Sequence, residues 1–148
     1  MIIAVIDTVV FIRGALSPGG ASASIVQAIR QRRFALLSSR QHMEEVFRVL
    51  GYPRIQRRFF VADKVRKKAV SQISFRSRLI SSTGTLSICR DPHDDYLIEI
   101  ALLGQADYLV TEDADLYDDP GVVQFLGERG TQVVRAAEFA QILRGTET

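Results

Sequence analysis

The sequence predicts a single α/β domain over residues 1–148, in which helices cover both faces of a central parallel sheet of about five strands, a three-layer α/β/α arrangement. Residues 2–6 are consecutive apolar residues, as in a strand buried on both faces. Short apolar segments then alternate with longer segments of helical periodicity, which is typical of parallel strands joined by helices. No repeat, low-complexity tract or interdomain linker divides the chain, so one domain is expected.

The first third of the chain supplies the next elements. Glycine, serine and proline within residues 14–20 indicate a loop after the first strand. A serine near the start of the segment 22–32 can cap a helix whose apolar residues recur at helical spacing. The apolar segment 34–37 predicts a short strand.

The middle of the chain is helical and basic. Ser39 can cap a helix that runs to about Leu50, where the Gly-Tyr-Pro sequence of residues 51–53 ends it. From 55 to 80, apolar residues form a helical stripe, and arginine and lysine occupy the other positions. Residues 86–89 are a candidate strand.

The last third returns to the α/β pattern. Asp91 and Pro92 are typical of a helix start, and the acids after them favour the first turn of a helix over about residues 93–103. Gly104 closes that helix. The remaining expected elements are a buried strand at 108–111, a short strand at 133–134 and a terminal helix at 137–143.

Composition excludes several classes of protein. No apolar run approaches the roughly 18 residues that span a bilayer, and the N-terminus lacks the features of a signal peptide, so no membrane association is expected. The single Cys89 excludes an internal disulfide, and two histidines cannot build a Cys/His zinc site. We therefore expect a cytoplasmic protein.

Charge is distributed unevenly along the chain. The net charge of +2 combines +12 over residues 1–90 with −10 over residues 91–148. Such asymmetry is typical of a face that binds polyanions beside a pocket that binds cations. Two solvated helix surfaces of opposite charge would give the same pattern, and charge alone leaves both readings open.

Carboxylates follow two of the predicted strands. Asp7 ends the first strand and Asp113 follows the strand at 108–111, so both should lie at the carboxyl edge of the sheet. Carboxylates that converge repel one another unless protons or cations offset their charge. Hard divalent cations prefer such oxygen ligands, and they can activate water for attack on phosphorus.

Each acid also has a structural reading. Asp91 reads more readily as a helix cap than as a ligand, and Asp94 and Asp95 could simply favour a helix N-terminus. Of Glu44 and Glu45, only one can point into a pocket. Other chemistries lack their motifs, because the chain has no P-loop, no GxGxxG and no G-x-S-x-G sequence.

Five segments of the sequence together carry a family resemblance. They are 5–10 (Val-Ile-Asp-Thr-Val-Val), 15–20 (Ala-Leu-Ser-Pro-Gly-Gly), 45–50 (Glu-Val-Phe-Arg-Val-Leu), 90–95 (Arg-Asp-Pro-His-Asp-Asp) and 106–116 (Ala-Asp-Tyr-Leu-Val-Thr-Glu-Asp-Ala-Asp-Leu). With these segments the chain resembles the PIN-domain ribonucleases, in particular the subgroup of toxin components of toxin–antitoxin pairs. The similarity runs from end to end, and the segment 106–116 is the most specific.

The resemblance implies a set of site residues and a reaction. The reaction would be cleavage of single-stranded RNA by an activated water with Mg²⁺ or Mn²⁺. A further threonine and two aspartates would support the metal-binding acids. The implied metal-binding and catalytic acids are Asp7, Glu45, Asp94 and Asp113, and the supporting residues are Thr8, as a hydroxyl that orients them, Asp91 and Asp115.

The resemblance also implies partners. Single-stranded RNA is the expected substrate, with its phosphates held by the basic stretch 54–78; a solvated helix face would have the same composition. An antitoxin protein is the expected protein partner, and homodimers are common in the family. The expected RNA-binding residues are Arg57, Arg58, Lys64, Lys67 and Lys68.

One position departs from the family pattern. Val9 stands where the family usually has Asn or Ser, so a polar group that would hydrogen-bond the acids is missing. This favours, as an alternative, a catalytically weakened module that binds RNA or protein. A phosphoryl-transfer domain that uses Asp7 as acceptor is a third hypothesis, but it would normally have a second acid close after Asp7 or a lysine near the last strand.

Overall fold

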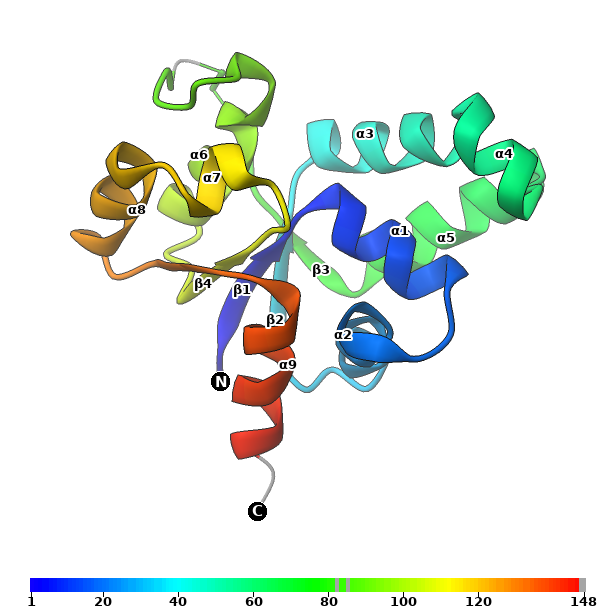
Figure 1. Cartoon of the computed structure of the whole chain (residues 1–148), viewed down its shortest axis with the longest axis horizontal. Helices are drawn as coiled ribbons and strands as arrows, with labels where there is room; N and C mark the ends of the chain where they lie inside the picture. The colour runs from blue at the N-terminus through cyan, green and yellow to red at the C-terminus, as the bar shows by residue number, and fades with distance from the viewer. Residues whose placement is uncertain (82, 85, 147–148) are drawn as a thin grey trace.

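A five-stranded parallel sheet organises the chain (Figure 1), as the sequence predicts. The computed structural model describes residues 1–81, 83–84 and 86–146, so Ser82, Thr85 and the last two residues of the predicted 1–148 domain lie outside the described part. The strand order is β3-β2-β1-β4-β5. The strands are β1 (Ile3–Ile6), β2 (Ala35–Ser38), β3 (Ser77–Leu79), β4 (Tyr108–Val110) and β5 (Gln132–Val134).

Helices fill the connections between the strands. Within the described residues they are α1 (Thr8–Leu16), α2 (Gly20–Arg30), α3 (Arg40–Leu50), α4 (Pro53–Phe59), α5 (Asp63–Phe75), the 3₁₀ turn η1 (Pro92–Asp94), α6 (Asp95–Leu103), α7 (Ala114–Tyr117), α8 (Pro120–Gly127) and α9 (Ala136–Gly145). None of these helices alone is long and apolar enough to cross a membrane, although α1 and α2, bent by 92°, reach that length and composition when counted together.

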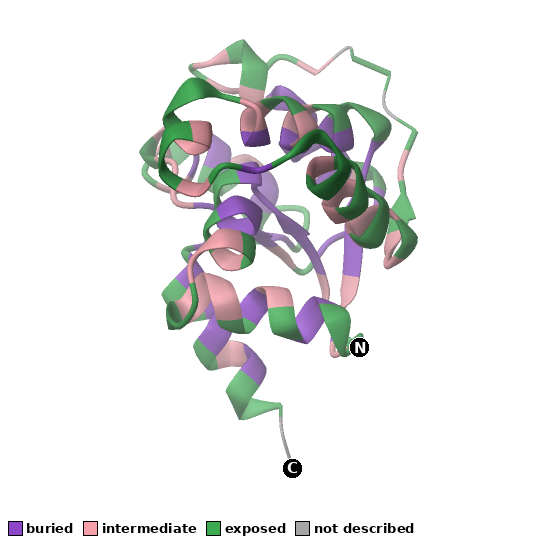
Figure 2. Ribbon diagram, turned by 90° about the vertical axis from the view of Figure 1, so that its right-hand side faces the viewer, coloured by how far each residue is buried: buried purple, intermediate pink, exposed green. Residues whose placement is uncertain are grey.

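The central strand β1 divides the core into two layers. Ala4 and Ile6 pack on one face of the sheet with α1, α2, α3 and α9, whereas Val5 packs on the other face with α6, α7 and α8. Figure 2 shows the buried residues gathered along the strands and on the inward sides of the helices. Burial on both faces explains why β1 has no polar alternation, as expected from its sequence.

A helix occupies most of the region that the sequence predicts as a loop. Residues 8–16 form α1, and Gly14 lies inside it because α2 crosses α1 closely at that point. A Cβ on Gly14 would lie 2.3 Å from the carbonyl oxygen of Ser22, so only glycine allows this approach. The loop prediction holds only for residues 17–19, where Gly19 has a φ of 81°.

The basic stretch 55–80 is not one continuous helix. Phe60 adopts a left-handed conformation (φ 47°) that separates α4 from α5, and the side chain of Gln56 ties the break by bonding both the N–H and the carbonyl of Val61. The stretch then ends in β3, an edge strand that was not expected. Its residues Ser77, Arg78 and Leu79 lack the apolar run of a buried strand, because β3 pairs only with β2.

The candidate strand at 86–89 is wrong. The backbone N–H groups of Ile88 and Cys89 donate to the carboxylate of Asp95, at 2.9 and 2.7 Å, instead of to a neighbouring strand. The short helices α7 and α8 were not predicted from the sequence. Asp113 and Asp119 are in fact their N-caps.

Candidate functional site

Two strand ends place aspartates at the carboxyl edge of the sheet. From β1 the chain continues to β2 on one side and reaches β4 on the other, so β1 and β4 flank the point where the strand order reverses. Ligands of parallel α/β sheets bind in the crevice at this point. Asp7 follows β1 and Asp113 lies three residues beyond β4, and both line the same cleft.

Thr111 connects the two aspartates. Its hydroxyl donates a hydrogen bond of 2.7 Å to Asp7 Oδ2, and the hydroxyl oxygen accepts the N–H of Asp113 at 3.0 Å. The other oxygen of Asp7 accepts the backbone N–H of Thr8 at 2.6 Å. The buried carboxylate of Asp7 is therefore fixed at both oxygens, and its orientation does not depend on a ligand.

Asp94, at the end of η1, is the third member of this aspartate cluster. Its Oδ2 atom is buried and has no hydrogen-bond partner among the described residues. Burial raises the pKa of Asp94 to about 7, and the negative charges of Asp113, Asp7 and Asp91 add to the shift. Burial also raises the pKa of Asp7, with a contribution from Asp113, while Thr111 and Thr8 oppose the shift.

Glu45 lines the same cleft from α3 but has a different partner. Its carboxylate forms an ion pair with Arg48, one turn later on the same helix. The cleft has a volume of about 930 Å³. The residues that line it are Asp7, Thr8, Val9, Arg13, Gln41, Glu44, Glu45, Arg48, Val49, Tyr52, His93, Asp94, Tyr96, Glu112 and Asp113.

The fit of this cleft to a cation is partial. Within the described residues, no three His, Cys, Asp or Glu side chains form a ready-made metal-binding group. The unpartnered oxygen of Asp94 and the mutual repulsion of Asp7, Asp94 and Asp113 nevertheless suit a divalent cation, because a cation would relieve both. Glu45 fits less well, since its charge is already offset by Arg48.

Comparison with known families agrees with this arrangement. A family model described as PIN domain matches residues 4–115, about three quarters of the chain. The chain belongs to the PIN-domain family. No curated protein and no solved structure matches the chain significantly. PIN domains are usually nucleases and generally use divalent metals. The matched residues include the aspartate cluster and Glu45 and end before α8, β5 and α9.

The expected supporting residues of this PIN domain lie in different surroundings. The hydroxyl that orients Asp7 is that of Thr111 and not the expected one of Thr8. The hydroxyl of Thr8 lies 3.4 Å from that of Tyr96. Asp91 caps η1 by accepting the N–H of His93, and its charge acts on Asp94. Asp115 pairs with Arg90 at 3.5 Å and is not part of the cleft.

The expected RNA-binding side chains are exposed but do not line the cleft. They lie on α4 and α5, and the cleft itself contains two other arginines, Arg13 and Arg48. The five expected residues are Arg57, Arg58, Lys64, Lys67 and Lys68. Val9 has 42% of its surface exposed and forms part of the cleft wall, where the usual polar residue would stand.

Sequence reasoning missed Thr111, Tyr96 and His42. The ring of His42 is fully buried between those of Phe11 and Tyr96, with centroids 5.5 Å from each, and neither of its nitrogens has a partner among the described residues. Burial lowers the pKa of His42 to about 3, so the ring is neutral. The sequence signal that could have placed His42 near the cleft is its position three residues before Glu45 on α3, because Glu45 lines the cleft.

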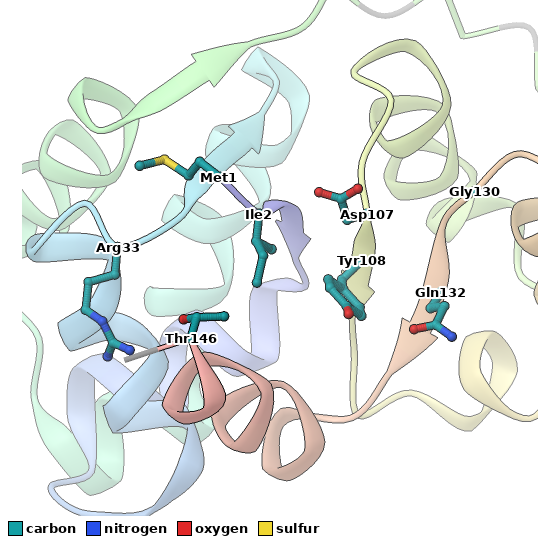
Figure 3. Close-up of a pocket in the computed structure, with 8 residues that line it drawn as sticks. All are labelled: Met1, Ile2, Arg33, Asp107, Tyr108, Gly130, Gln132 and Thr146. Carbon is teal, nitrogen blue, oxygen red and sulfur yellow. The ribbon is translucent and has the colours of Figure 1, made fainter. Parts of the chain in front are cut away.

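The opposite edge of the sheet has a hollow of a different kind. Figure 3 shows its lining, which comes from the N-terminus, the starts of β4 and β5 and the end of α9. Among the described residues that line it, the one carboxylate is that of Asp107, which accepts the backbone N–H of Ile3 at 2.8 Å. Among the described residues, the clustered acids therefore lie at the carboxyl edge of the sheet and not in this hollow.

Replacing Thr111 by valine is expected to lower the rate of RNA cleavage about tenfold. Thr111 orients Asp7, an expected metal ligand, and loss of such a partner typically lowers metal affinity or activity by 10–100-fold. Thr131→Val is the matched control, since the buried hydroxyl of Thr131 donates to the carbonyl of Ala106 at 2.6 Å, away from the cleft. Both variants should lose about 1 kcal/mol of unfolding free energy. Equal activity of the two variants would show that Thr111 has no role in the site.

Proposed function

We propose that the protein is a divalent-metal-dependent endoribonuclease that cleaves single-stranded RNA, and that it is the toxin of a toxin–antitoxin pair. The observation that carries the proposal is that Asp7, Asp94 and Asp113 line one cleft at the strand-order reversal of the sheet, where the charge of Asp113 raises the pKa of both other aspartates. Three carboxylates that share charge in one cleft need a cation or protons to coexist at neutral pH. The family assignment adds the nuclease class.

The side chains of the cleft have separate roles in this proposal. Asp7, Asp94 and Asp113 would hold Mg²⁺ or Mn²⁺, which when bound activates a water and offsets charge on the phosphate. Thr111 and the Thr8 amide hold the Asp7 carboxylate in one orientation. Asp94 carries a proton part of the time at pH 7 when no cation offsets the cluster. Arg13 supplies positive charge that attracts phosphates to an otherwise acidic cleft, whereas the charge of Arg48 is offset by Glu45.

A cleavage assay tests the proposal. Purified protein with Mn²⁺ is incubated with end-labelled RNA of 20 nucleotides, single-stranded or annealed to its complement, and with the matching DNA. Cleavage of the single strand alone, stopped by EDTA, is the expected result. Absence of cleavage in all arms, with the protein folded by circular dichroism, would overturn the enzymatic assignment.

The toxin role has a separate test. Induced expression of the wild-type protein in a bacterial host should arrest growth, and expression of Asp7→Asn to the same level should not. An antitoxin would relieve the arrest by placing a basic segment against the acids of the cleft. Equal growth of both cultures would remove the toxin role without touching the nuclease assignment.

Val9 favours a second candidate function, a PIN-like module that binds RNA without cutting it. Its side chain cannot hydrogen-bond the acids, although it stands in the wall of the cleft. Such a module would bind RNA with a strong salt dependence and without regard to a chelator. The cleavage assay above separates the two candidates.

Replacing Val9 by asparagine is expected to tighten Mn²⁺ binding about tenfold, because polar partners of metal ligands typically change affinity by 10–100-fold. Calorimetric titration of the wild type and the variant measures the change. Val123→Asn is the control, since Val123 is exposed to a similar degree (40%) and lies on α8. Unchanged affinity in Val9→Asn would show that a polar group at this position does not act on the metal.

A further inference from the structure

A second hollow continues the acidic cleft along α1. It has a volume of about 510 Å³ and is bounded by α1, the turn from α1 to α2, the end of α3 and α4. Val9, Arg13 and Val49 line both this hollow and the acidic cleft, so the two spaces meet at these three side chains. We call the second hollow the arginine groove, after Arg13, Arg54 and Arg58, which line it.

The arginine groove is positively charged, whereas the charged residues that line the cleft are mainly acids. No carboxylate is among the described residues that line it. Apart from Ser17 and Ser22, the side chains between the arginines are apolar, and the guanidinium of Arg58 lies over the ring of Phe59 at 5.1 Å from its centroid. Positive charge that tracks along an apolar and aromatic surface is the composition that binds single-stranded nucleic acid, because phosphates meet the cations and bases meet the apolar surface.

The turn between α1 and α2 leaves the groove open. Gly19 and Gly20 have φ values of 81° and 83°, and a Cβ at either position would meet nothing within 4 Å. The backbone of this turn is therefore accessible along one wall of the groove, where a phosphate can approach it closely. Both glycines line the groove.

Lys67 of α5 lies on a different side of α3. Lys67 lines a shallow hollow together with Phe47, and Phe47 points about 200° around the helix from Glu45, which lines the cleft. Arg66 holds α5 on that side by donating to the carbonyl of Phe47 at 2.7 Å. The hollow that adjoins the acidic cleft is therefore lined by α4 and not by Lys67, one of the lysines expected from the sequence.

We infer that the arginine groove binds the part of a single-stranded RNA that flanks the scissile phosphodiester, with Arg54 and Arg58 as phosphate contacts. This inference rests on the proposed function for the identity of the adjoining cleft. An acidic peptide would also suit the charge of the groove. The continuity of the groove with the cleft favours RNA, because one extended strand can occupy both spaces.

The experiment measures binding of a fluorescein-labelled oligouridine of 10 nucleotides by anisotropy, in EDTA so that no cleavage occurs, over a series of salt concentrations. The test variant is Arg54→Ala/Arg58→Ala, whose two side chains are exposed. Arg129→Ala/Arg144→Ala removes the same charge at exposed positions outside the cleft and the groove. Lys67→Ala/Lys68→Ala removes it from α5.

The groove variant is expected to bind about tenfold more weakly and to lower the slope of log K against log salt by about 1.4, since each phosphate contact on a single strand contributes about 0.7. The other two variants should keep the wild-type slope. Equal losses of RNA affinity in all three variants, or a larger loss in the α5 variant, would contradict RNA binding by the groove. An oligoglutamate that displaces the RNA from the wild type and binds more tightly would assign the groove to a peptide and overturn the inference.

The groove and the proposed function can fail separately. If the wild type cuts no RNA with Mn²⁺ but only the groove variant loses binding, RNA binding by the groove is supported and the nuclease assignment is rejected. If the wild type cuts RNA and the groove variant binds like the wild type, the nuclease assignment is supported and RNA binding by the groove is rejected.

Discussion

Replacing Asp7 by asparagine is expected to lower the rate of RNA cleavage by more than about a hundredfold while the fold is retained. The reason is that residues that only orient a metal ligand are already worth 10–100-fold, and Asp7 is itself an expected ligand. The fold should survive, because the amide oxygen can accept the Thr8 N–H and the amide nitrogen can donate to the Thr111 hydroxyl.

Initial rates with labelled RNA and Mn²⁺ measure this effect, and circular dichroism checks the fold. Asp118→Asn is the matched control, because Asp118 is an exposed carboxylate outside the cleft. It should cleave at the wild-type rate. A rate for Asp7→Asn within tenfold of the wild type would exclude Asp7 from the reaction.

Replacing Asp94 by asparagine is expected to stabilise the metal-free protein at pH 8 by about 1–2 kcal/mol, allowing for its partial exposure. The folded-state pKa of about 7 lies above the ordinary value of 3.8, mainly because of burial and then Asp113. Between pH 4 and pH 7 the folded chain thus keeps a proton that the unfolded chain has released. The wild-type unfolding free energy should fall as pH rises through this window and level off above it.

Urea denaturation in EDTA at pH 5 and pH 8 measures the effect. The fall between these two pH values should be smaller in Asp94→Asn than in the wild type, and Asp118→Asn should behave like the wild type. An Asp94→Asn protein that is less stable than the wild type at pH 8 would show that the charge of Asp94 does not destabilise the folded state.

Metal should reverse the order of stability. At a hundred times its dissociation constant, Mn²⁺ stabilises a protein by about 2.7 kcal/mol through binding to the folded state. The wild type should gain this stability, and Asp94→Asn should gain much less at the same concentration. The same carboxylate thus destabilises the metal-free fold and favours the bound form.

The sheet could be predicted from sequence where its strands are apolar, which includes β5 at one edge, but not at β3 at the other edge. β1 and β4 read as continuous apolar segments, and the aspartates that follow them could be placed at one edge on topology alone. β3 could not be found, since an edge strand of three residues, Ser77–Leu79, has no apolar run to mark it. The loop prediction was wrong at Gly14, because this glycine allows two helices to cross closely, although glycine usually marks a loop.

The candidate site could be predicted in part for the same kind of reason. Residue type and strand ends point to Asp7 and Asp113, and the family resemblance adds Asp94 and Glu45. The ion pair between Glu45 and Arg48 depends on side-chain geometry that spacing does not determine. Thr111 reads as an ordinary β-branched residue at the end of a strand, and only the structure shows its hydroxyl between two aspartates.

The basic stretch shows a further limit of sequence reasoning. Composition identified arginine and lysine over residues 54–78, but the side of α3 on which each helix lies depends on the break at Phe60. That break places Arg54 and Arg58 on the side of the cleft and Lys67 on the other side.

Anomalous diffraction from a crystal soaked in Mn²⁺ is the most direct measurement of whether the clustered carboxylates bind a divalent cation. The expected result is an anomalous peak in the cleft, in contact with Asp7, Asp94 and Asp113, that is absent from crystals of Asp94→Asn treated in the same way. A cleft without a peak at saturating Mn²⁺, or a peak only elsewhere on the molecule, would contradict a metal-dependent nuclease.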